Sequence, residues 1–277
     1  MEHVDAAVRR LQATESTFNG PALGSWMLEY ADIPFYAAFL YVGMVFGGQA
    51  WMKARGAFNL KPIFIVWNLI LATFSIYGGS ICIPYLMEHL VTKGFRYTVC
   101  HNSIDWWVNG RVGFWMAVFG LSKIPELIDT VFLVFQKKPV IFLHWYHHTT
   151  VMLYCWFAYT THHTVGVYFA CMNYAVHSIM YSYYFLMSVS GPTRKMVKPI
   201  APLITTLQLV QMVGGLGCII IATVYSNDNE GCEGNSHTIL RAALVMYGSY
   251  FALFAKFFAD AYIFKKKKPA AVAPKRD

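Results

Sequence analysis

Long apolar segments alternate with short basic ones along this chain, and this alternation constrains the fold more than any other feature. A helix needs about 20 mostly apolar residues to cross a bilayer. Seven segments approach or exceed that length, at 33–51, 62–86, 112–135, 139–161, 164–190, 199–225 and 239–264. Only 13% of the 277 residues are charged, against about 25% in soluble domains. The sequence therefore predicts an all-α, polytopic membrane protein with seven transmembrane helices.

Lysine and arginine lie mostly on one side of the predicted membrane. Fourteen of them fall in 52–61, 136–138, 191–198 and 265–277, and five fall in the connections on the other side. Cytosolic loops carry the excess of Lys and Arg, which predicts a cytosolic C-terminus and a luminal N-terminus. The expected organisation is a luminal segment 1–32, a transmembrane domain 33–264 and a basic cytosolic tail 265–277. This rim accounts for most of the net charge of +8, so the charge is no argument for nucleic-acid binding.

Cys100 and Cys232 differ from the other four cysteines, which lie inside predicted spans. Both fall in connections assigned to the luminal side. An oxidising lumen allows two such thiols to pair, so this topology predicts a Cys100–Cys232 disulfide.

Polar side chains inside the predicted spans recur at helical spacing. Steps of three and four residues keep them on one helix face, and ionisable groups within a membrane usually mark function. All of them fall in the cytosolic half or near the midplane, whereas the luminal halves are apolar or aromatic. We expect a polar chamber that opens to the cytosol, with an apolar pocket beyond it. The set comprises Lys123, Glu126, Asp129, Thr130, His144, His147, His148, Asn173, His177, Tyr181, Tyr184, Gln208 and Gln211.

Structural roles remain open for part of this set. Lys123 can form an ion pair with Glu126 or Asp129, and intramembrane glutamines can simply join helices by hydrogen bonds. Outside the spans, His162 and His163 are expected to be ordinary surface residues of a short loop.

The triplet His144, His147 and His148 is compatible with two kinds of chemistry. Imidazoles at this spacing can bind iron or zinc, as in membrane desaturases and hydroxylases. Those enzymes draw on several histidine boxes, whereas only four histidines lie within the predicted spans here. Alternatively, a neutral imidazole can act as a nucleophile toward a thioester, with neighbouring groups handling protons and charge. A seven-span receptor or carrier would explain the span count but not the convergence of polar groups.

Four motifs in the polar stretches resemble one family. They are Lys-x-x-Glu-x-x-Asp-Thr at 123–130, His-x-x-His-His at 144–148, Asn-x-x-x-His-x-x-Met-Tyr-x-Tyr-Tyr at 173–184 and Thr-x-x-Gln-x-x-Gln at 205–211. Together, complete and in this order, they resemble the very-long-chain fatty acid elongases, the 3-ketoacyl-CoA synthases of the endoplasmic reticulum. The resemblance implies that six of the seven helices form a barrel around a narrow acyl tunnel. It also implies condensation of an acyl-CoA with malonyl-CoA, which gives a 3-ketoacyl-CoA, CO2 and CoA without a cofactor.

The resemblance further implies roles for individual residues. His147 would be the nucleophile that carries the acyl group, and His177 would bind or activate the malonyl unit. His144 and His148 would orient His147, and Asn173 would donate a hydrogen bond to developing negative charge. The chamber would be built by Lys123, Glu126, Asp129 and Thr130, and lined by Gln208, Gln211, Tyr181 and Tyr184.

CoA carries phosphates, so the basic rim gains a second expected use. The best candidates to bind them are Lys137 and Lys138, followed by Lys195, Lys198, Lys265 and Lys266. Expected partners are the ketoacyl-CoA reductase, the 3-hydroxyacyl-CoA dehydratase and the enoyl-CoA reductase of the elongation cycle. The filling of the histidine motif by Trp145 and Tyr146 is closer to family members that act on saturated and monounsaturated chains. The sequence defines neither the chain length nor the oligomeric state, a homodimer included.

Overall fold

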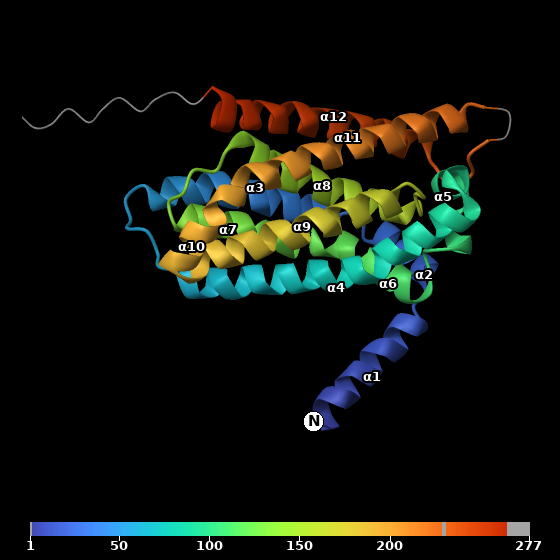
Figure 1. Cartoon of the computed structure of the whole chain (residues 1–277), viewed down its shortest axis with the longest axis horizontal. Helices are drawn as coiled ribbons and strands as arrows, with labels where there is room; N and C mark the ends of the chain where they lie inside the picture. The colour runs from blue at the N-terminus through green and yellow to red at the C-terminus, as the bar shows by residue number, and fades with distance from the viewer. Residues whose placement is uncertain (1, 229–230, 265–277) are drawn as a thin grey trace, which may run out of the picture.

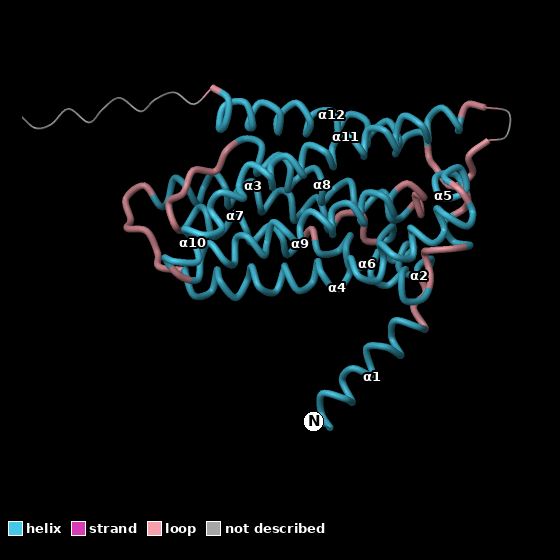
Figure 2. Tube along the Cα trace, in the orientation of Figure 1, coloured by secondary structure: helices cyan, strands magenta, loops and turns pink. Residues whose placement is uncertain are grey.

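The computed structural model describes residues 2–228 and 231–264, and every regular element within these ranges is helical. The long helices run side by side along one axis (Figures 1 and 2), whereas the N-terminal helix projects away from the bundle. Prolines occupy the first turn of several helices, including Pro34, Pro62 and Pro202. Proline fits there because its missing N–H would have no helical partner at that position. The prediction of an all-α protein is confirmed.

Twelve α-helices make up the described chain. The first two are α1 (Glu2–Ser16) and α2 (Gly20–Glu29), within the segment 1–32. The helices that follow are α3 (Ile33–Met52), α4 (Lys61–Lys93), α5 (Phe95–Cys100), α6 (Gly110–Ser122), α7 (Ile128–Phe135), α8 (Phe142–Thr160), α9 (Gly166–Val189), α10 (Gly191–Val197), α11 (Ala201–Ser226) and α12 (His237–Phe258). Each of the seven predicted apolar segments therefore coincides with helix.

Four helical stretches are long and apolar enough to cross a membrane, namely Ile33–Met52, Lys61–Lys93, Gly191–Ser226 and His237–Ile263. The other predicted spans are helical but differ from these four. The third is interrupted, and α8 and α9 carry the histidine and asparagine motifs, whose polar side chains lower their hydropathy. The length and hydropathy of these helices are those of a multi-pass membrane protein.

The predicted segment 112–135 is not one continuous helix. α6 ends at Ser122, a 3-10 turn covers Pro125–Leu127, and α7 begins at Ile128. Pro125 has no N–H to donate and its ring clashes with the preceding turn, so a regular helix is interrupted there. The prediction that Lys123, Glu126 and Asp129 share one regular helix face was therefore wrong.

Six helices follow one another in a closed succession of packing contacts. α4 packs along α9, α9 along α11, α11 along α12, and α12 against α8. α8 in turn packs against α6, which returns to α4. α3 lies outside this succession and contacts α7 and α8. The polar motifs lie on helices of this succession and on α7, which continues α6.

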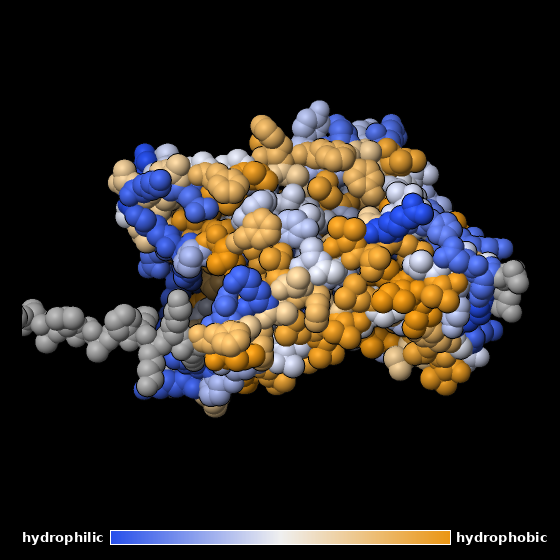
Figure 3. Space-filling model, turned by 90° about the horizontal axis from the view of Figure 1, so that it is seen from above, coloured by the Kyte–Doolittle hydropathy of each residue, from blue (hydrophilic) through white to orange (hydrophobic). Residues whose placement is uncertain are grey.

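The hydrophobic surface and core are arranged as a membrane requires. Large apolar side chains are exposed on the outer faces of the helices, for example Phe39 on α3, Val213 on α11 and Val245 on α12. The space-filling view shows this apolar band between two polar ends, with a hollow in the surface toward the left end of the view (Figure 3). The core is densest at the opposite end, where α5 lies.

That opposite end is tied together by the predicted disulfide. Cys100 at the end of α5 is bonded to Cys232, which lies in the connection between α11 and α12. His163 lies at the same end, in the short connection between α8 and α9, and is only 1% exposed. The expectation that His163 is a surface residue was wrong, because this connection is packed against the segment after α5, where Ser103 donates to the His162 carbonyl and Thr164 donates to the His101 carbonyl.

Candidate active site

The histidine triplet lies in the first turns of α8, facing α7 and α12. The Nε2 atom of His144 lies 2.9 Å from the Thr130 hydroxyl, which is 2.7 Å from the hydroxyl of Tyr41 on α3. The His144 and His148 rings are 4.6 Å apart, and those of His147 and His148 are 5.4 Å apart. The triplet therefore forms one cluster, and Thr130 anchors its first member.

His147 faces α12 on its other side. Its ring centre lies 4.8 Å from that of Tyr250 and 6.5 Å from that of Phe254. The Tyr250 hydroxyl donates to the backbone carbonyl of His147 at 3.2 Å. The position of His147 is thus fixed through its own backbone, and its imidazole nitrogens are left out of these contacts.

A chain of hydrogen bonds joins α6 to α9 through four motif residues. Lys123 Nζ donates to Glu126 Oε1 at 2.8 Å and to Asn173 Oδ1 at 3.1 Å. Asn173 Nδ2 lies 3.0 Å from His177 Nε2. An ammonium group can only donate, so the Asn173 oxygen must face Lys123 and its NH2 group must face His177. His177 Nε2 is therefore the acceptor, and this nitrogen carries no proton in the described arrangement.

Asp129 belongs to a separate contact on the far side of the break in segment 112–135. Its carboxylate accepts hydrogen bonds from Trp67 Nε1 at 2.6 Å and from the Tyr181 hydroxyl at 2.8 Å. The Tyr181 ring lies 5.2 Å from that of His177. Of the two ion pairs left open by the sequence, the structure contains Lys123–Glu126, and Asp129 instead links α4, α7 and α9.

The remaining chamber candidates lie further from the histidines. Gln208 Nε2 lies 3.4 Å from the sulfur of Met180, and Gln211 is 7% exposed. The Tyr184 ring contacts that of Tyr181 at 6.4 Å. Gln208 therefore contacts α9 from α11, and Gln211 is buried in the bundle.

The motif side chains differ in how exposed they are. His144, His147, Asn173 and His177 are half-buried, so a ligand can reach them, whereas Lys123 and Glu126 are 2% and 3% exposed. The accessible imidazoles are thus distinct from the enclosed Lys123–Glu126 pair, which holds Asn173 through Lys123.

The basic residues at the end from which α8 begins differ in their surroundings. Lys137 donates to the backbone carbonyl of Arg55 at 2.9 Å, whereas Lys138 lies over the ring of Phe64. Partial burial, and then the charge of Arg194, lower the pKa of Lys138. Lys195 and Lys198 are exposed on α10 and the turn after it. Lys265 and Lys266 lie outside the described residues.

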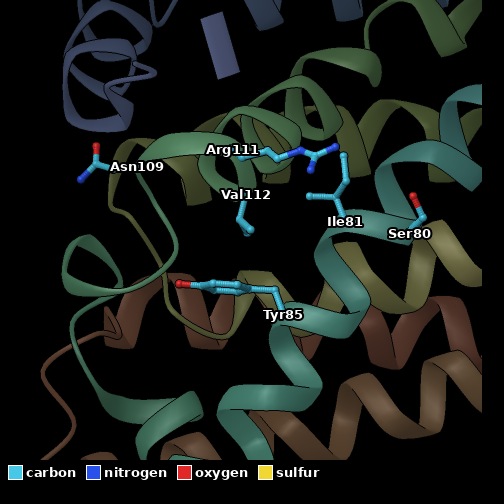
Figure 4. Close-up of a pocket in the computed structure, with 6 residues that line it drawn as sticks. All are labelled: Ser80, Ile81, Tyr85, Asn109, Arg111 and Val112. Carbon is cyan, nitrogen blue, oxygen red and sulfur yellow. The ribbon is translucent and has the colours of Figure 1, made fainter. Parts of the chain in front are cut away.

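Neither a metal site nor the surface pocket beside the start of α6 coincides with this cluster. The described residues contain no group of three or more His, Cys, Asp or Glu side chains suited to one metal ion. A surface pocket of about 470 Å³ lies between α4 and the start of α6 (Figure 4), at the end of the molecule that carries α5. Arg111 on its wall pairs with Glu15 of α1 at 3.0 Å. This pocket contains no predicted site residue.

Sequence reasoning missed several residues that contact the motifs. Tyr41 and Trp67 lie in segments without a polar stripe, and Tyr250 lies in the last apolar segment. An aromatic residue in such a segment gives no signal of its own, because tyrosine and tryptophan are also common lipid-facing residues. Their contacts with Thr130, Asp129 and His147 appear only when the helices are assembled.

Comparison with known proteins gives a consistent result over nearly the whole chain. Residues 26–270 match the family described as ELO: GNS1/SUR4 family. The chain is 45% identical to a very long chain fatty acid elongase 4 of Trypanosoma cruzi, over 99% of this chain and 95% of that protein. It is 41% identical to fatty acid elongase 3 of Trypanosoma brucei, over 91% of each chain. It is 42% identical to very long chain fatty acid elongase 6 of Drosophila melanogaster, over 90% of this chain and 78% of that protein.

Proposed function

The chain belongs to the GNS1/SUR4 (ELO) family, and we propose from this membership that it is the condensing enzyme of fatty acid elongation. It would join an acyl-CoA to malonyl-CoA and give a 3-ketoacyl-CoA two carbons longer. The observation that carries this proposal is the meeting of two distant motifs, in which Lys123 Nζ lies 3.1 Å from Asn173 Oδ1 and Asn173 Nδ2 lies 3.0 Å from His177 Nε2. A thioester condensation needs this combination of a nucleophile with nearby donors.

In the first half-reaction His147 takes the acyl group from CoA. Its imidazole attacks the thioester carbonyl, so that a C–N bond forms and the C–S bond breaks. CoA leaves as the thiol, with the proton that the imidazole gives up. His144 and His148 hold the ring and its proton in place, and the Thr130–Tyr41 pair orients His144.

In the second half-reaction malonyl-CoA loses CO2, and the electron pair of the broken C–C bond forms an enolate. The enolate carbon attacks the acyl carbonyl, the new C–C bond forms, and the C–N bond to His147 breaks. The released imidazole takes up a proton. Asn173 and His177 act on the enolate oxygen, and the ammonium of Lys123 supports them because a fixed positive charge stabilises developing negative charge. The sequence of steps uses side chains of this chain alone and no cofactor.

The proposal extends to the architecture and the cell. All seven helical segments cross the membrane of the endoplasmic reticulum, with the N-terminus in the lumen and the C-terminus in the cytosol. The closed succession of α4, α9, α11, α12, α8 and α6 forms the barrel around the acyl site. The Cys100–Cys232 disulfide supports this orientation, because disulfides persist in an oxidising lumen.

CoA would enter from the end of the bundle that carries the basic connections. The first candidates to bind its phosphates are Lys138, Lys195 and Lys198. None of their ammonium groups donates a hydrogen bond to a carbonyl of the described residues. Lys137 keeps part of its donor capacity beside the Arg55 carbonyl. Downstream partners would be the reductases and the dehydratase that complete each round of elongation.

The test of this function is a condensation assay with the purified protein. Incubation with malonyl-CoA and acyl-CoAs from butanoyl to octadecanoyl should give a 3-ketoacyl-CoA. A folded protein that yields no product at any chain length would overturn the proposal. The desaturase and hydroxylase alternatives are not supported, because the relatives are elongases and the described donor set does not suit a metal ion.

His147→Ala should abolish turnover, because no other group in the proposed sequence of steps carries the acyl chain. Intact-mass analysis after incubation with acyl-CoA alone should show an adduct on the unmodified protein and none on the variant. His237→Ala is the matched control, since His237 is exposed at the start of α12, and it should keep both activity and adduct. Normal turnover by the His147 variant would refute its role as nucleophile.

A further inference from the structure

Tyr250 on α12 lies against the imidazole of His147, although it belongs to none of the four motifs. The two ring centres are 4.8 Å apart, with an angle of 49° between the ring planes. The ring of Phe254, one turn further along α12, is 6.5 Å from that of His147. A cation is attracted to an aromatic ring within about 6 Å of the ring centre. Of these two rings, only that of Tyr250 therefore lies within this range of the imidazole.

The Tyr250 side chain is fixed against α8 by its hydroxyl. The hydroxyl oxygen is 2.5 Å from the Thr150 hydroxyl and 3.2 Å from the backbone carbonyl of His147. Thr150 donates its own proton to the Tyr146 carbonyl at 2.7 Å, so the Tyr250 O–H can be shared between its two acceptors. Only 2% of Tyr250 is exposed. A ring that is packed and bonded in this way needs no reorganisation when charge develops beside it.

The carboxylates of the motifs are bonded to other groups. Glu126 accepts from Lys123 at 2.8 Å, and Asp129 accepts from Trp67 at 2.6 Å. Among the described residues, no carboxylate forms a hydrogen bond or an ion pair with the His147 imidazole. In Ser-His-Asp hydrolases a carboxylate stabilises the imidazolium that forms during the reaction. A positive charge on His147 would therefore need a different kind of partner.

We propose that the Tyr250 ring stabilises the positive charge that develops on the His147 imidazole during acyl transfer. This inference rests on the proposed condensing function, with His147 as the nucleophile. As an imidazole nitrogen gives its lone pair to the thioester carbon, the C–N bond forms and the imidazole becomes a cation. It stays one until the C–S bond breaks and its N–H proton leaves with the CoA thiol. The electron-rich face of an aromatic ring attracts such a cation.

The attraction acts on the rate of acylation and not on the binding of acyl-CoA. The charge is absent while the thioester is merely bound, and it is present in the transition state of the attack on the thioester carbon. An interaction that is made only in the transition state accelerates the chemical step and leaves ground-state binding unchanged. The expected signature is therefore a change in the maximal rate of acylation at a constant half-saturating concentration of acyl-CoA.

Single-turnover acylation of the purified full-length protein tests this role. The protein is mixed with acyl-CoA alone, and the acyl adduct and the released CoA are followed with time. Tyr250→Leu removes the ring and should lower the maximal rate of adduct formation by about three- to thirtyfold, which is the loss expected for one cation–π contact. The acyl-CoA concentration that gives half of the maximal rate should change by less than about twofold.

Two ring variants separate charge stabilisation from packing. Tyr250→Phe keeps the ring and removes the hydroxyl, so it should retain the rate to within about threefold. A trifluorinated phenylalanine at the same position has nearly the same shape, but its fluorines withdraw electron density from the ring face. Its rate should fall from that of Tyr250→Phe toward that of Tyr250→Leu. This pair decides the question if Tyr250→Leu does not fold.

The matched control is another hydrogen bond between the same two helices. Ser249 Oγ lies 3.0 Å from the Tyr146 hydroxyl, in a contact that does not involve His147. Ser249→Ala removes this link between α8 and α12 and should leave the rate of acylation unchanged. An equal loss of rate in Ser249→Ala would show that the packing of α8 and α12 sets the rate, and it would overturn the proposal.

Other outcomes would also contradict a role of the Tyr250 ring in charge stabilisation. An unchanged rate in folded Tyr250→Leu, equal rates for the fluorinated and unfluorinated rings, or a change confined to the half-saturating concentration would each overturn it. If the unmodified protein formed 3-ketoacyl product but no acyl adduct, the assignment of His147 as nucleophile would fall, and this role with it. The absence of any 3-ketoacyl product would instead overturn the condensing function itself.

Discussion

Single polar residues persist inside this bundle because most of them have a partner of the right kind. Lys123 and Glu126 are almost fully buried, and each neutralises the other at 2.8 Å. Removal of one member of such a pair would leave a buried charge, which typically costs about 3–5 kcal/mol. The Asn173 amide links this pair to His177, because its oxygen accepts from Lys123 and its NH2 group donates to His177. At this scale the site is a set of satisfied hydrogen bonds from Lys123 to His177.

His163 is the contrasting residue, because it is buried without such a partner. Neither of its ring nitrogens has a hydrogen bond among the described residues, and its exposure is 1%. Burial lowers the pKa of His163 from the ordinary 6.5 to about 4. Between these values the unfolded chain binds a proton that the folded chain does not, so the free energy of unfolding should fall as the pH drops from about 6.5 to 4.

This linkage predicts a loss of up to about 3 kcal/mol, at about 1.4 kcal/mol per unit of pKa. Thermal unfolding of the detergent-solubilised protein at pH 7 and pH 4.5 should show it. In His163→Leu the pH-dependent difference should shrink, whereas in His237→Leu, at an exposed position, it should not. An unchanged pH dependence in His163→Leu would show that other groups cause it.

At the scale of elements, glycines let pairs of helices approach closely. A Cβ atom on Gly215 of α11 would overlap the ring of Tyr247 on α12, and one on Gly78 of α4 would overlap Tyr174 on α9. These are the helix pairs that pack most extensively. Pro125 instead interrupts the helix between α6 and α7, within the segment that carries the Lys123–Glu126 pair.

Gly215→Ala should therefore destabilise the protein by about 1–3 kcal/mol, the usual cost of overpacking a core. On the same helix, a Cβ atom on Gly217 would meet no neighbouring atom within 4 Å, so Gly217→Ala should be neutral or stabilising by up to about 1 kcal/mol. Thermal unfolding of both variants measures the difference. Equal melting temperatures would contradict the view that the Gly215–Tyr247 contact sets the spacing of α11 and α12.

For the molecule as a whole, one covalent bond joins parts of the chain that are 132 residues apart. The Cys100–Cys232 disulfide links α5 to the connection between α11 and α12, and Arg96 pairs with Asp228 at the same end. The bond therefore holds α11 and α12 to the end of the bundle that carries α5.

Replacement of Cys100 and Cys232 by serine should lower stability by about 4–5 kcal/mol, because the loop that the bond closes is long. The melting temperature of the unmodified protein should fall to a similar extent in dithiothreitol, and that of the double variant should not respond. Cys218→Ala, which removes a thiol that forms no disulfide, should retain the sensitivity to reductant. A double variant as stable as the unmodified protein would contradict this role of the bond.

The sequence by itself determined the helical class, the apolar segments, the motifs and the cysteine pair. Each depends on local composition, on helical spacing or on the side of the membrane, and these can be read without knowing which helices touch. Only the tertiary structure decided that Lys123 pairs with Glu126 while Asp129 bonds to Trp67 and Tyr181, and that His163 is buried. The physical reason is that apolar and aromatic residues fit a lipid-facing surface and a packed interior equally well. Their roles follow from the neighbours that the assembled helices bring to them.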